Sequence, residues 1–239
     1  MEIINEIVDT VSADSEFINI FNSKGATAFQ IVEDSLRDAL EPSVSTFSTR
    51  ASYSLPEYNI NQYYSTYCGP ASAIQALVSS GKISEPSNPT NAVYNVGQAM
   101  GTDDGGTNIT SLSNYMNRYE SSTSVKYKAK AFTRFSYDKA LDFVIYSLAN
   151  GRAPVMRVYD TALMSYYNGA TYSHYVTIIG INTNTEKITV SDPHYSRTYR
   201  GIHTITFSEF YDLMKGDSST VDGWLSVYTS VGGDSYTYE

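Results

Sequence analysis

The chain has 239 residues, of which 41% are hydrophobic and 17% are charged, so it is long enough to bury the core of one domain. Its net charge of −9 argues against a nucleic-acid-binding protein, which needs a basic surface, and against binding to anionic membranes. No apolar run approaches the roughly 20 residues that cross a bilayer, so we expect no membrane span. The single cysteine excludes a scaffold held together by disulfides.

Residues 1–50 differ from the rest of the chain in charge. They hold nine acidic and three basic residues and two apolar runs with helical spacing, and a linker follows at residues 41–49. We expect an acidic helical extension at 1–50, either packed on the domain or acting as a pro-region over a cleft, and a main domain at 51–239.

The first residues lack the basic and apolar segments of a signal peptide. The polar residues are mostly Ser, Thr, Asn and Tyr, with few Lys and Arg. This composition favours a secreted or cell-surface protein whose signal peptide lies outside this numbering, with the cytoplasm as the alternative.

The first half of the main domain has helical patterns. The run from Gly69 has Pro70 in its first turn and ends at Gly81, which places Cys68 at a helix N-terminus. Further helices are expected at 90–100, capped by residue 90 or 91, at 109–116 after a glycine-rich loop, and at 138–150 before Gly151.

The second half has strand patterns at 153–159, 174–181, 187–192, 198–207 and 223–228. A turn signal at 183–186 joins the second and third of these strands into a hairpin, which should bring Asp192 back near His174. Helices followed by antiparallel strands predict an α+β fold.

Cys68 is a candidate nucleophile, because a helix N-terminus and a nearby histidine both lower the pKa of a thiol. His174 is the candidate base because it opens an apolar strand, and His194 is the alternative. A glutamine side chain and the backbone N–H at the cysteine can donate to an oxyanion.

Structural interpretations of the same residues stay open. Cys68 can be a buried structural thiol, His174 a strand-end residue, Asp192 a turn residue before proline, and Gln62 a loop residue. A zinc site built from Cys68, His174, Asp192 and His194 is a further alternative, but these residues lack the close ligand spacing of known zinc motifs. We therefore expect no cofactor.

Three short motifs, in this order, resemble papain-like cysteine peptidases of the bacteriocin leader-processing type, and in particular their stand-alone bacterial branch. The motifs are Gln62-x5-Cys68-Gly69-Pro70-Ala71, His174-Tyr175-Val176 and Val190-Ser191-Asp192-Pro193. The glycine-rich loop at Gly106-Thr107 also fits that branch, and the resemblance spans roughly residues 53–230.

The resemblance implies a papain-like fold and a peptide or protein substrate. It implies Cys68 as nucleophile, His174 as general base, Asp192 as orienting residue and Gln62 as oxyanion donor. The sequence differs from transporter-linked relatives because no ATP-binding Gly-x4-Gly-Lys-Ser/Thr pattern is present, which argues against a role in leader-peptide export.

The expected function is that of a thiol hydrolase, most simply a cysteine peptidase that works through an acyl-enzyme on Cys68. Candidate substrate contacts flank the cysteine and the histidine: Tyr67, Gly69, Ser173 and Tyr175. The tyrosines near the cysteine can equally pack around the helix start. The alternatives are an amidase or acyltransferase of the same fold, and a surface binding module without activity.

Overall fold

The computed structural model describes residues 52–121, 127, 137–158, 160–215 and 226–227, which belong to a compact unit of residues 50–239. The helical extension expected at residues 1–50 lies outside the described residues. The first helices and strands are β1 (Ser52–Ser54), α4 (Cys68–Ser79), α5 (Pro89–Met100), α6 (Ile109–Met116), η1 (Asn117–Tyr119) and α7 (Tyr137–Ala149). After them come β2 (Val155–Val158), η2 (Thr161–Leu163), η3 (Ser165–Tyr167), β3 (His174–Asn182), β4 (Lys187–Asp192), β5 (Gly201–Thr206), α8 (Phe207–Lys215) and β6 (Ser226–Val227).

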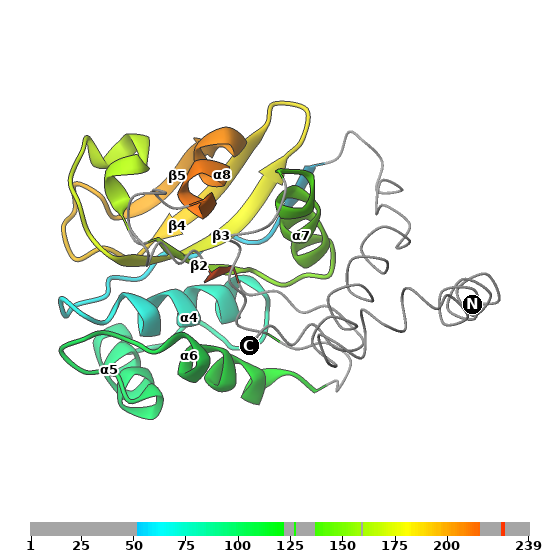
Figure 1. Ribbon diagram of the computed structural model, residues 1–239. Helices are drawn as coiled ribbons and strands as arrows, with labels where there is room; N and C mark the ends of the chain where they lie inside the picture. The colour runs from blue at the N-terminus through cyan, green and yellow to red at the C-terminus, as the bar shows by residue number, and fades with distance from the viewer. Residues whose placement is uncertain (1–51, 122–126, 128–136, 159, 216–225, 228–239) are drawn as a thin grey trace, which may run out of the picture. The chain divides into compact units, whose positions relative to one another are not determined.

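The described strands form one antiparallel sheet in the order β5-β4-β3-β2-β6. β3 is its central strand. One edge of β3 pairs with β4, and the other pairs with β2 near His174 and with β1 near Asn182. In Figure 1 the sheet with α7 and α8 fills the upper part of the view, and α4, α5 and α6 lie below it.

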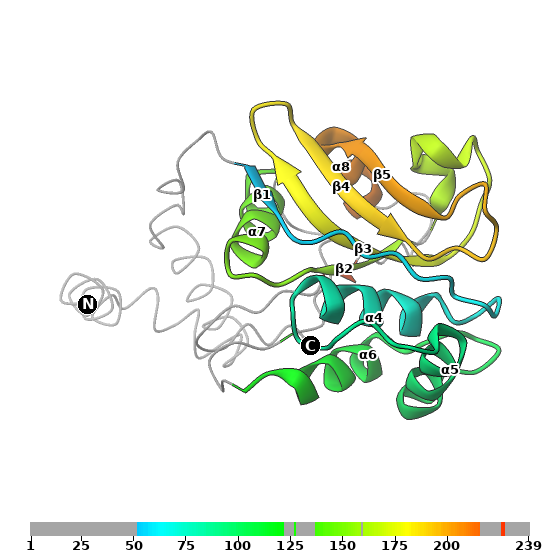
Figure 2. The ribbon, with the colours of Figure 1, turned by 180° about the vertical axis from the view of Figure 1, so that it is seen from behind.

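The expected hairpin is present between β3 and β4. Its turn is held by the side chain of Asn182, whose Oδ1 accepts from the backbone N–H groups of Asn184 (3.0 Å) and Thr185 (3.1 Å). The register pairs Thr177 with Ser191, so the start of β3 and the end of β4 lie at the same end of the sheet. The two strands are seen side by side in both Figure 1 and Figure 2.

Helix α4 lies between the sheet and the helices α5 and α6. Nearly all of its residues are buried, and it contacts β3 as well as α5 and α6. The small side chains of Ala71, Ser72, Ala73 and Ala76 allow these close approaches on every side. It starts at Cys68 as expected, and Gly81 beyond its end has a φ of 65°, a left-handed conformation that suits glycine.

Most expected helices are confirmed, with corrected ends. The cap of α5 is Asn88, whose side chain accepts from the backbone N–H of Asn91 at 3.1 Å, so the expected cap at residue 90 or 91 is wrong. The reason is Pro89: it takes the first helical position, where a missing N–H has no cost.

The last third of the chain differs more from expectation. The strand expected at 198–207 is shorter, because Phe207 begins α8, and the sequence patterns did not indicate α8 or β1. Phe207 and Phe210 are buried, so packing of two aromatic rings selects a helix where the local residues favour a strand. Of the strand expected at 223–228, only β6 lies within the described residues.

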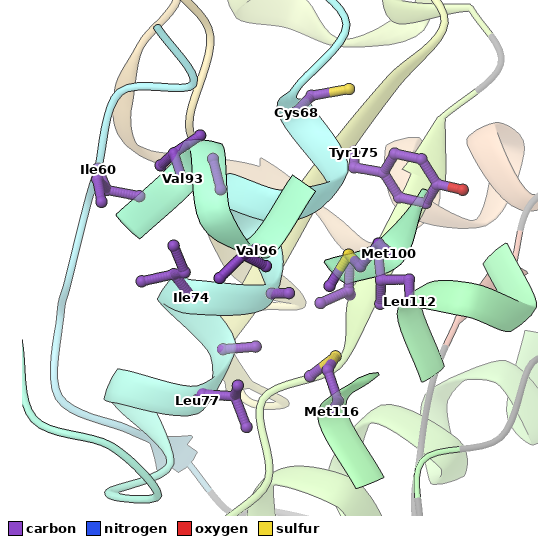
Figure 3. Packing of buried hydrophobic residues seen from close by; sticks show 14 of the residues in the cluster. Ile60, Cys68, Ile74, Leu77, Val93, Val96, Met100, Leu112, Met116 and Tyr175 are labelled. Carbon is purple, nitrogen blue, oxygen red and sulfur yellow. The ribbon is translucent and has the colours of Figure 1, made fainter. Parts of the chain in front are cut away.

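The hydrophobic core between α4 and its neighbours combines aliphatic, Met and Tyr side chains (Figure 3). Ile74 and Leu77 of α4 lie in its middle, with Leu112 and Met116 of α6 beside them. Cys68 belongs to the same cluster but lies at its end, where the helix begins. The core therefore holds the start of α4 against the sheet.

Candidate active site

Cys68 is the first residue of α4 and is 7% exposed. In Figure 3 its sulfur points away from Ile74 and Leu77 rather than into the cluster. His174 and the backbone groups of Tyr175 and Gly69 lie close enough to the thiol to favour its ionised form. These contacts are directed toward a negative charge on sulfur, which a purely structural thiol would not need.

His174 opens β3, and its Nε2 lies 2.9 Å from Oδ1 of Asp192 at the end of β4. Because Nε2 is on the carboxylate, the other ring nitrogen, Nδ1, is the one available to Cys68. Asp192 is fully buried, and His174 is 3% exposed. The structure therefore brings Cys68, His174 and Asp192 into one chain of contacts.

Cys68 and His174 stabilise each other's charged form. Burial alone would raise the pKa of the Cys68 thiol, but the hydrogen bond and charge of His174 lower it below its usual range. Burial would lower the pKa of His174, but Asp192 and Cys68 raise it to about 10. Together the two shifts favour a thiolate beside an imidazolium at neutral pH.

Asp192 stays ionised by the same balance. Burial favours its neutral form, but the charge and hydrogen bond of His174, with further donors, lower its pKa below the usual value. The described residues supply four hydrogen bonds to its side chain. Oδ1 receives those of His174 and the His194 N–H (2.8 Å), and Oδ2 those of the Tyr166 (2.9 Å) and Tyr167 (2.8 Å) hydroxyls.

The comparison with known families agrees with this geometry. Residues 55–219, more than half of the chain, match the family described as the Peptidase_C39 like family. The chain belongs to this family. Its helices packed on an antiparallel sheet form the papain-like α+β fold that was expected, and membership places it among proteins of cysteine peptidase type.

One solved structure that the chain matches is described as a double glycine motif protease from an AMS/PCAT transporter in complex with the leader peptide. It is 16% identical to this chain, covers 75% of this chain and 95% of its own, and has a TM-score of 0.44. No curated protein matches the sequence significantly.

Gln62 of this C39-like protein lies in the loop before the nucleophile, and both N–H groups of its amide are already used in hydrogen bonds. It is buried, and its Nε2 donates to the backbone oxygens of Tyr64 (2.7 Å) and Ser65 (2.9 Å). Its Oε1 accepts no hydrogen bond within the described part of the chain. In this arrangement Gln62 shapes the loop before Cys68, and donation to an oxyanion requires the exchange of one of these two bonds.

The same loop contains a sharp turn. The backbone N–H of Tyr64 donates to the oxygen of Gln62 at 2.7 Å across Tyr63, which has a φ of 59°. A γ-turn with a positive φ at a residue other than glycine is rare and strained. The backbone N–H of Gln62 donates to the oxygen of Pro193 at 2.8 Å, so the loop is tied directly to the segment after Asp192.

His194, the alternative base, is not placed for that role. It is buried beside His174, with a ring-centroid distance of 5.3 Å. Burial and the charge on His174 lower its pKa to about 4. Its Nδ1 accepts from the backbone N–H of Ser196 at 3.0 Å, which leaves a neutral ring in the wall around Asp192.

Two of the candidate substrate contacts, Tyr175 and Gly69, take part in packing. Tyr175 is 4% exposed and its hydroxyl donates to the oxygen of Thr107 at 3.0 Å. A side-chain carbon on Gly69 would lie 2.6 Å from Oγ1 of Thr107. Glycine is therefore needed there for the close approach of the loop at residues 102–107.

Tyr67 directly precedes Cys68 in the chain, and Ser173 directly precedes His174. Tyr67 is partly buried and packs on α5: its ring stacks on Tyr94 at 6.5 Å and touches Gly97, and its hydroxyl accepts from Gln98 at 3.1 Å. Ser173 is exposed next to His174. Of the four candidates, Ser173 best keeps the placement that a substrate contact requires.

Tyr166 and Tyr167 are the main site residues that sequence patterns do not indicate. They lie in the short helix η3, 26 and 25 residues before Asp192, and the chain has 22 tyrosines. A tyrosine hydroxyl that binds a carboxylate leaves no local pattern in a sequence. Its partner is defined only by the tertiary fold.

No three His, Cys, Asp or Glu side chains converge as metal ligands within the described ranges. In the same ranges, no helix is both long and apolar enough to cross a membrane. Cys68, His174 and Asp192 are instead linked in series, with the histidine between a thiol and a carboxylate.

Proposed function

We propose that this protein is a cysteine peptidase that cleaves peptide bonds through an acyl-enzyme on Cys68. The observation that carries the proposal is the series Cys68–His174–Asp192, in which the pKa of the thiol is lowered and that of the imidazole is raised. A nucleophile, a base and a group that orients the base are the minimum for this chemistry.

In the proposed reaction the Cys68 thiolate attacks the carbonyl carbon of a peptide bond. His174 gives its Nδ1 proton to the leaving amine, which departs and leaves a thioester on Cys68. A water molecule then gives a proton to His174 and attacks the thioester carbonyl. This step releases the acid and restores the thiolate–imidazolium pair.

The oxyanion formed in both steps needs hydrogen-bond donors. The backbone N–H of Cys68 lies in the first turn of α4, where a helix supplies no acceptor to its own N–H groups. Gln62 is the proposed second donor. This role requires its amide to leave the carbonyl of Tyr64 or Ser65 when substrate binds.

The direct test is the rate of Cys68 alkylation by iodoacetamide from pH 4 to 10. We expect fast labelling of the wild type at pH 5–6, because the proposed pairing with His174 keeps part of the thiol ionised well below its usual pKa, and loss of this fast labelling in His174→Ala. Cys68→Ala is the matched blank because the chain has no second cysteine. Labelling that rises only near pH ~8.5, equally in wild type and His174→Ala, would show an ordinary thiol and reject the proposal.

A positive result leads to substrates. Wild type and Cys68→Ala are incubated with peptide libraries, with and without an added amine, and the products are identified by mass spectrometry. Internal cleavage by the wild type alone supports a peptidase. Release of ammonia or incorporation of the amine would instead indicate an amidase or acyltransferase.

A further inference from the structure

The two oxygens of the Asp192 carboxylate have different partners. Oδ1 faces His174 at 2.9 Å and the backbone N–H of His194 at 2.8 Å. Oδ2 accepts from two adjacent phenols, Tyr166 at 2.9 Å and Tyr167 at 2.8 Å. A carboxylate bound at one oxygen only can rotate away from its histidine. Two further donors on the second oxygen hold the plane of the group.

Both phenol rings are themselves fixed. The Tyr166 ring stacks on His203 of β5 with a centroid distance of 3.8 Å and an angle of 1°. The Tyr167 ring stacks on Tyr199 at 4.5 Å and 16°, and Tyr167 is fully buried. Their helix η3 is tied to α8, because the backbone N–H of Ser165 donates to Glu209 at 2.6 Å. The donors are therefore preorganised by stacking rather than by their hydrogen bonds alone.

The chemistry of the donors suits a buried anion. A carboxylate with no solvent contact favours its protonated form unless donors stabilise the charge. Phenols donate without adding a positive charge, and burial beside Asp192 raises the pKa of both Tyr166 and Tyr167, so both keep their protons. They stabilise the charge of Asp192 without competing with His174 for it.

We infer that Tyr166 and Tyr167 are positioning residues that keep the Asp192 carboxylate charged and oriented toward His174. This inference rests on the proposed function, since it assigns the pair a part in preparing the base of that reaction. Other titratable groups around the carboxylate and its two phenols are Cys68, Tyr172, His174, His194, Tyr199, His203 and Glu209.

The test is the titration of Asp192 in the full chain, followed by carbon-13 NMR of protein labelled at the aspartate side-chain carboxyl, with the signal assigned by Asp192→Asn. The variants are Tyr166→Phe and Tyr167→Phe, which keep the rings and their stacking. Loss of one donor should raise the midpoint of Asp192 by about one pH unit. Tyr115→Phe is the control. The hydroxyl of Tyr115, in α6, hydrogen bonds with that of Tyr119, so this substitution should leave the Asp192 midpoint unchanged.

A second measurement keeps the inference testable if NMR assignment fails or a variant is weakly folded. The stability lost by Tyr167→Phe, measured by urea unfolding, should be larger at pH 7 than at a pH below the Asp192 midpoint of the folded protein, where the protonated carboxyl no longer needs the donor. In an Asp192→Asn background this difference between the two pH values should disappear.

The outcomes separate the inference from the proposed function. Fast wild-type labelling of Cys68 at pH 5–6 with a raised Asp192 midpoint in both phenylalanine variants supports both. The same labelling with an unchanged midpoint and a stability loss independent of pH overturns the inference alone. Wild-type labelling only near pH ~8.5 overturns the proposed function, and the positioning role with it.

Discussion

His174 is the residue whose titration should affect the stability of the protein above neutral pH. Its side chain is buried, yet the charge of Asp192 raises its pKa to about 10, so its protonated form is stabilised by folding. A group whose pKa is raised in the folded state stabilises the protein fully below its unfolded pKa, about 6.5 for histidine. That stabilisation is lost as the pH rises toward the folded value.

We therefore expect the free energy of unfolding to fall between pH ~6.5 and about 10, in proportion to the charge lost from His174. The measurement is urea unfolding across this range on a Cys68→Ala background, which removes the titration of the thiol and its share in raising the pKa of His174, while Asp192 still raises that pKa. His174→Gln on the same background should show a flatter profile. Two parallel profiles would contradict a protonated His174 in the folded protein.

The residues of the site differ in how far sequence could indicate them. The hairpin pattern predicted that Asp192 would lie near His174, whereas the pairing of Cys68 with these two residues came from the resemblance to a peptidase family. Gln62 was expected near the cysteine, but the direction of its amide depends on a turn with an unusual φ at Tyr63. No composition or spacing predicts that geometry.

At the scale of elements, the buried carboxylate of Glu120 links three segments of the chain through ion pairs with Arg152 and Lys82. Glu120, at the end of η1, has a side chain that is 1% exposed. It accepts from Arg152 before β2 at 2.6 and 2.8 Å and pairs with Lys82 after α4 at 3.0 Å. This network joins the helical layer to the start of β2, at the end of α4 away from Cys68.

Removal of this charge should weaken the junction. Glu120→Gln is expected to lower the stability by about 3 kcal/mol, since breaking a buried ion pair leaves its partner uncompensated. The exposed Glu57→Gln should change it by less than about 0.5 kcal/mol. Chemical denaturation of both variants measures the difference. A Glu120→Gln protein as stable as the Glu57→Gln protein would show that the network contributes little.

β1 and α8 were not predicted because neither has a distinct pattern of its own in the sequence. β1 is three residues long and pairs only with the end of β3, which is too short for a period-2 pattern. α8 follows β5 without a loop, so β-branched residues and helix formers run together. Long helices that end shortly before a glycine, such as α4 and α7, were the easiest to predict.

At the scale of the whole molecule, the described fold and the family match lie within residues 50–239. We expect the fragment 50–239 to unfold cooperatively in urea and to keep fast labelling of Cys68 at pH 5–6. If residues 1–49 cover the site in the full chain, the fragment will label faster. An equal rate in a folded fragment would reject that covering role, and a fragment that does not fold would show that the domain needs its first residues.

The loop before Cys68 is hydrogen bonded to the end of β4, and these bonds join parts of the site that are far apart in the sequence. Asn59 donates to the oxygen of Asp192, 133 positions away, at 2.7 Å, and the neighbouring Gln62 holds Pro193. Contacts between such distant positions close large loops, and the entropy of closing those loops must be offset before the contacts stabilise the chain. The thiol of Cys68 has His174 and Asp192 beside it only when β3 and β4 have docked on α4. We therefore expect Cys68 to react slowly in a nascent or partly unfolded chain.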